Sequence, residues 1–273
     1  MKHIPFNDQT QIPQLGFGTW QIPDRDAVST VAKAIEIGYR SIDTAAIYQN
    51  EKGVGEGIKE SGIPRKDLYL TTKLWNSDQA DGDSLKALEK SLKLLGVDYV
   101  DLYLIHWPAP KKNHYSSAWR ALIKFKEMGL VKSIGVCNFQ ISHLERIIQE
   151  TGVIPVTNQI ELHPSFQQKD LRAFHEKHKI VTEAWSPLAQ GHLMKDETLI
   201  KIGQKYRKSA AQVILRWHME IGNVTIPKSV TSSRIKENFE IFDFSLTEDE
   251  RKLIEKLDSK DGRVGPNPDT ADF

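Results

Sequence analysis

Short apolar runs, separated by longer stretches of mixed polarity, set the pattern of this chain. Eight runs have strand length, at residues 15–17, 41–43, 68–73, 99–106, 133–137, 156–161, 180–185 and 224–226. Six of the intervening stretches end on a glycine that is followed closely by the next run. Glycine suits that position because the residue after a helix often needs φ above zero. These glycines are Gly38, Gly62, Gly96, Gly129, Gly152 and Gly222.

The stretches between the apolar runs carry helical signals. Four leucines fall on one helical face, namely Leu85, Leu88, Leu92 and Leu95. Three helix starts have capping-box spacing. The pairs are Ser142 with Glu145, Ser209 with Gln212, and Thr247 with Glu250. Strands that alternate with helices run parallel with helical crossovers, so eight such units predict an α/β fold of the closed (β/α)8, or TIM, barrel type.

The chain length fits one such barrel, which typically needs about 250 residues. The 273 residues contain no Pro/Ser-rich linker and no shift in composition. We therefore expect a single domain over residues 1–273. Extended pieces at residues 2–6 and 12–15 predict an N-terminal β-hairpin. Residues 258–273 are rich in Gly, Pro and Asp, and predict a short C-terminal tail over the surface.

Charge and composition narrow the class of partner. The chain mixes 37 basic with 36 acidic residues, so it lacks the basic stripe that follows a nucleic-acid backbone. No apolar run approaches the length of a membrane span, and the N-terminus lacks a signal-peptide core. Cys137 is the only cysteine, which excludes an internal disulfide and favours a reducing compartment. We expect a cytoplasmic protein that binds neither nucleic acid nor membranes.

Two other motifs are weak evidence for a binding site. Residues 16–20, GFGTW, resemble the start of a dinucleotide fingerprint, but Gln21 stands where a third glycine should be and Pro23 follows. We therefore exclude a Rossmann site there. His175 and His178 have a possible metal-binding spacing, but they lie in a charged helix without further ligands. We expect no metal.

Chemistry-bearing side chains close three adjacent strands of the predicted barrel. Asp43 ends the second strand and Tyr48 follows in its loop, while Lys73 ends the third strand and His106 the fourth. The active site of such a barrel lies at the C-terminal ends of its strands, so all four should meet at one rim. Each residue alone has an ordinary explanation, as a cap, a solvated charge or packing. Their joint occurrence favours an active site.

These four side chains fit proton transfer to a carbonyl oxygen. A free tyrosine has a pKa near 10, which is too high for efficient acid catalysis at neutral pH. We expect the Lys73 ammonium to lower the pKa of the Tyr48 phenol. A shift of two or three units requires roughly 3–4 kcal/mol. Asp43 would keep the lysine charged and aimed, and His106 would orient the carbonyl oxygen. An electron source is missing, so a bound hydride donor is implied.

Seven ordered motifs then identify a family. They are GFGTW at 16–20, IDTA at 42–45 with Tyr48, TKLW at 72–75, IHWP at 105–108, GVCNF at 135–139, NQIELHP at 158–164, and IPKS at 226–229. With these motifs the chain resembles the aldo-keto reductases nearly from end to end. The resemblance implies that Asp43, Tyr48, Lys73 and His106 are the catalytic tetrad, with Tyr48 the general acid. It also implies reduction of aldehydes and ketones to alcohols, and the family's common monomeric state.

The same resemblance implies a binding site for NADPH/NADP+. Cys137, Asn138 and Gln159 would hold the nicotinamide carboxamide, and Trp185 would stack on its ring. Position 137 is usually serine, and a thiol is the weaker hydrogen-bond partner. The loop at residues 186–191 would cover the pyrophosphate. The remaining cofactor-binding residues would be Ser186, Leu188, Gln190, Gly191, Lys228, Ser229, Arg234 and Asn238.

Two cations near a predicted helix start favour NADPH over NADH. Lys228 and Arg234 suit the 2′-phosphate, because backbone amides and the helix dipole also attract an anion there. The alternative is that Arg234 only pairs with an acid such as Glu237 on the exposed face.

Substrate class follows less directly. Trp20, Trp75, His106 and Trp107 should line the substrate pocket. The short loops and tail resemble the bacterial 2,5-diketo-D-gluconic acid reductases and methylglyoxal-reducing relatives, which implies small dicarbonyls and keto-sugar acids. The alternative function is a regulatory or structural relative that binds the cofactor with little turnover. A metal-dependent barrel hydrolase is a third reading, and it lacks ligands.

Overall fold

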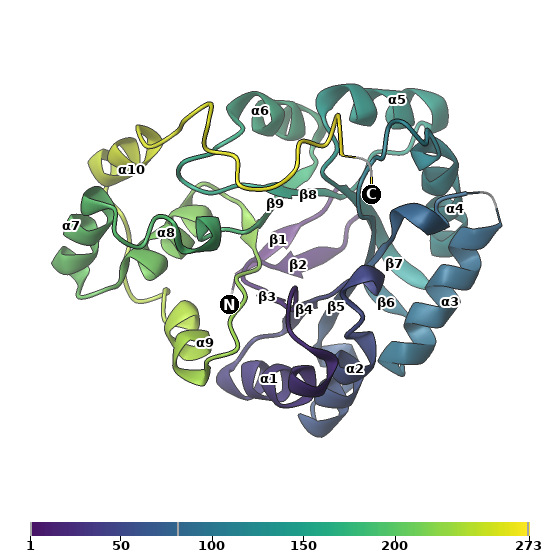
Figure 1. The fold of residues 1–273 in the computed structure, drawn as a ribbon, viewed down its shortest axis with the longest axis horizontal. Helices are drawn as coiled ribbons and strands as arrows, with labels where there is room; N and C mark the ends of the chain where they lie inside the picture. The colour runs from purple at the N-terminus through teal and green to yellow at the C-terminus, as the bar shows by residue number, and fades with distance from the viewer. Residues whose placement is uncertain (1, 81, 272) are drawn as a thin grey trace.

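The strands of this protein close into a ring. The computed structural model describes residues 2–80, 82–271 and 273. Within them eight parallel strands form one sheet in chain order. They are β3 (Phe17–Gly18), β4 (Ser41–Asp43), β5 (Tyr69–Leu74), β6 (Val100–Ile105), β7 (Val131–Cys137), β8 (Thr157–Glu161), β9 (Val181–Trp185) and β10 (Val224–Thr225). The Thr225 backbone bonds to Gly16 and Gln14, which joins the last strand to the first. The predicted (β/α)8 barrel is confirmed (Figure 1).

Helices surround this barrel on the outside (Figure 1). They are α1 (Asp24–Ile37), α2 (Glu51–Glu60), α3 (Asp83–Leu95), α4 (Tyr115–Glu127), α5 (Ile141–Thr151), α6 (Lys169–His178), α7 (Glu197–Tyr206), α8 (Ala210–Glu220), α9 (Ser232–Phe239) and α10 (Glu248–Glu255). Each buries one apolar face, as α3 does with Leu88, Leu92 and Leu95. The six predicted glycines all have positive φ, between 66° and 130°. Among the described residues, every helix is too short or too polar to span a bilayer.

Helix starts follow the sequence in two of three cases. The capping boxes that form are Ser209 with Gln212 and Thr247 with Glu250. The prediction of Ser142 with Glu145 is wrong. Helix α5 begins at Ile141, one residue before Ser142, because Gln140 is its N-cap residue and the Gln140 amide donates to Nδ1 of His143. A glutamine and a histidine thus do the work that a serine and a glutamate usually do.

The two chain ends occupy opposite mouths of the barrel. Strands β1 (His3–Pro5) and β2 (Gln11–Pro13) pair antiparallel, so the predicted hairpin is confirmed. Its Phe6 and Ile12 pack with Leu102 and Val224 inside the barrel and close the mouth where the strands begin. After α10 the tail runs back over the mouth where the strands end (yellow in Figure 1).

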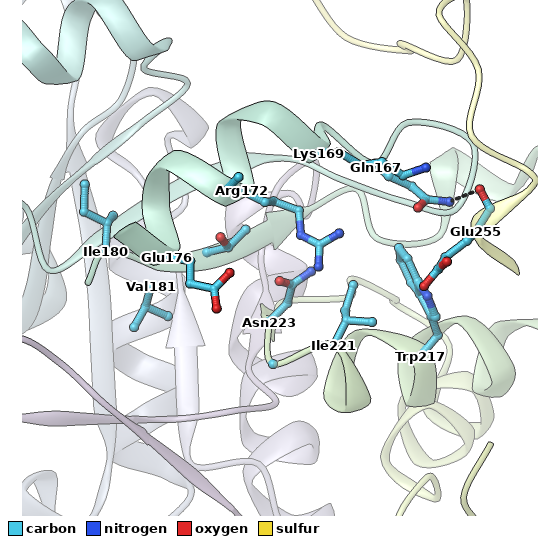
Figure 2. A pocket seen from close by; sticks show the side chains of 13 residues that line it. Gln167, Lys169, Arg172, Glu176, Ile180, Val181, Trp217, Ile221, Asn223 and Glu255 are labelled. Carbon is cyan, nitrogen blue, oxygen red and sulfur yellow. Dashed lines mark hydrogen bonds between the residues drawn. The ribbon is translucent and has the colours of Figure 1, made fainter. Parts of the chain in front are cut away.

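A cavity of about 610 Å³ lies outside the barrel, beside α6, α8 and α10. Figure 2 shows Arg172 reaching from α6 toward Asn223, with Trp217 to their right. Glu176 and Glu255 also line the cavity, so it contains charges of both signs. None of the side chains predicted for chemistry lies in it. The candidate site is at the strand ends instead.

Of the two histidines whose spacing could suit a metal, His175 has a structural role. His175 is fully buried, and its Nε2 lies 3.0 Å from the Asn158 amide nitrogen while its Nδ1 lies 2.9 Å from the Thr182 hydroxyl. An amide N–H must donate to Nε2, so the ring is neutral and carries its proton on Nδ1. Burial agrees, since it lowers the pKa of His175 to about 3. His175 joins α6 to β8 and β9.

Candidate active site

The predicted tetrad is brought together at the C-terminal mouth of the barrel. Asp43 is the last residue of β4, Lys73 lies one residue before the end of β5, and His106 follows β6. Tyr48 ends the short 3₁₀ turn η1 (Ala46–Tyr48) that leads out of β4. Its ring lies 5.6 Å from the His106 ring, centroid to centroid, and 5.2 Å from Lys73 Nζ. Four residues from three consecutive strands therefore surround one small volume.

A buried ion pair forms the base of this group. Lys73 Nζ donates to Asp43 Oδ1 at 2.5 Å and to the Thr44 carbonyl oxygen at 2.9 Å, and both charged side chains are at most 3% exposed. Burial acts to lower the pKa of Lys73, but the Asp43 carboxylate raises it above its ordinary value. The lysine therefore stays charged. An ammonium has three protons, and the third is left for the Tyr48 phenol.

The expected lowering of the Tyr48 pKa is wrong. Burial raises this pKa, and although the Lys73 ammonium acts to lower it, the net shift is upward. Tyr48 as a whole is half-buried at the mouth, and burial is the largest influence on the pKa of its hydroxyl. The sequence reveals the favourable Lys73 charge but not the loss of solvation, which is the larger effect on this pKa. Tyr48 is therefore a neutral phenol at neutral pH.

His106 is also neutral. Burial, helped by the Lys73 charge, lowers its pKa well below the ordinary value. Its backbone oxygen accepts a hydrogen bond from Asn138 Nδ2, which fixes the residue at the end of β6. Nδ1 is buried and has no hydrogen-bond partner in the part of the chain that the structure describes. A neutral imidazole offers one N–H donor, so this residue can donate to an oxygen beside Tyr48.

The residues expected to hold the nicotinamide lie next to the tetrad. Trp185 Nε1 donates to Asn138 Oδ1 at 2.8 Å, and Gln159 Nε2 donates to Asp43 Oδ2 at 2.8 Å. The Cys137 thiol is buried and donates to Gln159 Oε1 at 3.8 Å. An amide group has two donors and two lone pairs, so Asn138 and Gln159 each keep hydrogen-bonding capacity. This donor and acceptor set fits a carboxamide.

The loop predicted to cover the pyrophosphate has an unusual backbone. Ser186, Ala189 and Gln190 all have φ between 45° and 53°, and Gly191 has φ 94°. Non-glycine residues in this left-handed region cost of order 1–3 kcal/mol each and cluster at functional sites. Leu188 packs against the barrel core and anchors the loop. The conformation supports a ligand-binding loop.

The residues predicted to bind the 2′-phosphate lie before α9 and in its first turn. Lys228 and Arg234 are exposed, and in the described residues neither makes an ion pair. The alternative pairing of Arg234 with Glu237 is wrong, because Glu237 accepts a hydrogen bond from Ser209 instead. Arg234 lies in the first turn of α9, so two free cations stand near a helix N-terminus, where an anion is favoured. Along the chain, Ser229 lies between Lys228 and Arg234, and the buried Asn238 follows in α9.

An aromatic wall encloses the outer part of the site. Trp75 lies 5.2 Å from the His106 ring, Trp107 is buried beside it, and Trp20 is 43% exposed at the rim. Phe273 also belongs to this wall, and it was not predicted from the sequence. Its ring stacks on Trp75 at 5.7 Å and meets Trp107 edge-on at 5.2 Å. An aromatic residue at the end of a polar tail was the one signal that could have found it.

A buried glutamate holds the tail in place, and it too was missed. Glu161 Oε1 accepts from the Val264 amide at 2.5 Å, and Oε2 accepts from the Gly265 amide at 2.9 Å. Burial acts to raise the pKa of Glu161, but hydrogen bonds from His163 and from these two amides bring it below its ordinary value. A Cβ on Gly265 would collide with Trp185, so the tail passes directly over the nicotinamide-side residues.

Known proteins resemble this chain in sequence and architecture. A model of the Aldo/keto reductase family matches residues 14–259. The methylglyoxal reductase DkgA of Yersinia pestis is 54% identical over 97% of this chain and 96% of its own length. A solved aldo/keto reductase from Brucella melitensis is 60% identical, with a TM-score of 0.91 over 94% of this chain and 99% of its own. A Gox0644 variant solved in complex with NADPH is 48% identical, with a TM-score of 0.96 over 100% of this chain and 99% of its own. The chain belongs to the aldo/keto reductase family.

Proposed function

We propose that this protein is an NADPH-dependent carbonyl reductase in which Tyr48 protonates the substrate oxygen. The observation that carries the proposal is the buried pair of Lys73 and Asp43 set directly beside the Tyr48 and His106 rings. Such a group has no evident structural purpose at a barrel mouth, whereas it suits proton donation. Asp43, Tyr48, Lys73 and His106 are the proposed catalytic residues.

The chain's own side chains divide the work of proton transfer. NADPH, when bound, supplies the hydride. The substrate oxygen accepts hydrogen bonds from the Tyr48 phenol and the His106 imidazole, which hold the carbonyl in place. As negative charge builds on that oxygen, it becomes more basic than a phenolate and takes the Tyr48 proton. Lys73 then stabilises the phenolate that is left, and Asp43 keeps Lys73 oriented.

A raised pKa does not oppose this role. Tyr48 must hold its proton until the substrate oxygen becomes strongly basic, and burial ensures that it does so at neutral pH. Lys73 matters when the phenolate forms, because a buried negative charge without a partner is costly. The ammonium thus stabilises the product of proton transfer rather than ionising the phenol beforehand.

The cofactor site is proposed from the same geometry. Asn138, Gln159 and Trp185 would hold the nicotinamide, with Cys137 as a weaker contributor, and Arg234 with Lys228 would bind the 2′-phosphate. Free cations near the start of α9 favour NADPH over NADH. The further cofactor residues proposed are Ser186, Leu188, Gln190, Gly191, Ser229 and Asn238.

The proposed substrates are small carbonyl compounds, such as dicarbonyls and keto-sugar acids. Phe273 stacks on Trp75 and contacts Trp107, so the wall beside His106 is closed by the tail. This arrangement favours compact substrates, and the methylglyoxal reductase name of the Yersinia pestis relative points the same way. We also propose that residues 1–273 form one domain that works as a cytoplasmic monomer.

A turnover assay tests the proposal. NADPH consumption is followed by its absorbance with methylglyoxal, simple aldehydes and keto-sugar acids, and repeated with NADH. We expect turnover with at least one small dicarbonyl or keto-sugar acid and a preference for NADPH. Tight NADPH binding without turnover on any of them would instead favour a regulatory or structural protein that binds the cofactor.

A further inference from the structure

A second carboxyl group lies inside the barrel beneath the tetrad. Glu183 is the middle residue of β9 and is 1% exposed. Its neighbour Thr182 faces outward, because the Thr182 hydroxyl bonds to His175 on α6. Side chains alternate along a strand, so Glu183 points into the barrel. It lies two residues below Trp185, on the same face of β9.

Glu183 connects to the ion pair through one amide. In the register of β8 and β9, Glu183 is paired with Gln159. The Gln159 side chain hydrogen-bonds both Glu183 and Asp43 Oδ2, and Asp43 in turn holds Lys73. A single glutamine therefore bridges two carboxyl groups. A series of contacts therefore leads from Glu183 through Gln159 and Asp43 to Lys73, whose ammonium faces the Tyr48 phenol.

The charges around Glu183 do not balance if it ionises. The titratable groups that face it are Asp43 from β4, Tyr69 and Lys73 from β5, and Cys137 from β7. Lys73 is the one cation among them, and Asp43 already occupies it. Glu183 Oε2 has no hydrogen-bond partner in the described part of the chain. A buried, unpaired carboxylate is costly, so the neutral acid is favoured.

We propose that Glu183 is a positioning residue of the reductase, which supports proton donation while it is a neutral acid and impairs it once it ionises. The inference rests on the proposed function. The neutral acid keeps Gln159 on Asp43, and Asp43 keeps Lys73 beside Tyr48. An ionised Glu183 adds a second negative charge next to Lys73 and competes for the Gln159 amide. Both effects weaken the stabilisation of the Tyr48 phenolate.

The titration falls in a range that can be measured. Burial, together with the Asp43 charge, raises the pKa of Glu183 to about 8. Between pH 7 and pH 9 its protonated fraction therefore falls about tenfold. The phenol and the thiol nearby have pKa values that are raised as well, so they lose their protons later. A loss of activity centred near pH 8 would thus belong to Glu183.

The experiment is a pH profile of hydride transfer in a single turnover, with NADPH bound and methylglyoxal added. In the wild-type protein we expect the rate to fall about tenfold from pH 7 to pH 9. Glu183→Gln keeps the shape and cannot ionise, so its rate should change less than about twofold over that range. Glu220→Gln, a carboxylate on α8 outside the barrel, should keep the wild-type profile. An unchanged alkaline fall in Glu183→Gln would overturn the proposal.

A second measurement does not depend on the variant folding. Infrared spectra of the wild-type protein should contain the carbonyl band of a protonated carboxylic acid that disappears as pH rises through about 8. Absence of such a band at pH 7 would overturn the proposal. The infrared titration also separates the two claims. A protein without turnover at any pH would refute the proposed function, while the band would still report whether Glu183 holds its proton.

Discussion

Replacing Lys73 with methionine tests the ion pair at the base of the site. The Lys73 side chain is fully buried, and its ammonium donates to Asp43 and to the Thr44 carbonyl. Methionine has a similar length and fills the space without charge. The change leaves the Asp43 carboxylate, 3% exposed, with Gln159 as its remaining side-chain donor.

The expected cost is large because a buried charge loses its partner. Removing one member of a buried pair typically destabilises a protein by about 3–5 kcal/mol. Native proteins have about 5–15 kcal/mol of stability in total, so Lys73→Met should fold but with a much lower urea midpoint. Adding Asp43→Asn removes the stranded charge. Replacing both members of a buried pair is often nearly neutral, so the double variant should recover most of the loss.

Urea unfolding at pH 7 of the wild type, the two single variants and the double variant measures this directly. The coupling free energy from the cycle should be several kcal/mol and favourable. Activity should not follow stability, since kcat should stay at least about 100-fold down in the double variant, which has no cation beside Tyr48. A loss below about 1 kcal/mol in Lys73→Met would refute a charged buried pair.

Three further outcomes follow. Arg234→Ala should raise KM for NADPH about tenfold or more, and KM for NADH little, because a charge-assisted contact of about 1.5–3 kcal/mol is lost. Lys236→Ala on the same helix is the control. An unchanged cofactor preference in Arg234→Ala would contradict the assignment. Glu161→Gln should weaken the binding of the tail to the barrel by about 1.5–3 kcal/mol, so that Phe273 leaves the aromatic wall. KM for the carbonyl substrate should then change, while KM for NADPH should not. Tryptic cleavage of the released tail is the independent measurement. His175 is neutral in the folded protein, so below pH 6.5 the unfolded chain binds a proton that the folded chain does not. The unfolding free energy should therefore fall by about 1.4 kcal/mol for each unit by which the pH is lowered. His175→Asn should show a smaller slope of unfolding free energy against pH between pH 6 and pH 5.

Much of the site could be predicted because barrel geometry is regular. Strand ends in a closed parallel barrel converge, so the positions of Asp43, Lys73 and His106 in their runs were enough to place them together. Glycines at helix ends were also predictable, because a local backbone requirement selects them. Short-range rules fail where another side chain can satisfy the same need, as Gln140 does at the start of α5.

Features that depend on distance or on burial were not predictable. Phe273 meets Trp75 only because the tail folds back over the mouth, and nothing local in either segment specifies that path. The Tyr48 pKa was predicted in the wrong direction, because a sequence reveals a neighbouring charge more readily than the loss of solvent around a phenol. Glu183 was not predicted either, for a different reason. A glutamate within an apolar run cannot be placed on the inner or outer face until the register is known.

The most direct test of the central claim is the rate of NADPH oxidation by Tyr48→Phe with methylglyoxal. The variant removes one hydroxyl and keeps the ring that packs against His106. We expect kcat to fall about 100- to 10,000-fold, while the Kd for NADPH, measured by fluorescence, stays within about twofold. Wild-type turnover in Tyr48→Phe would contradict the assignment of Tyr48 as the proton donor.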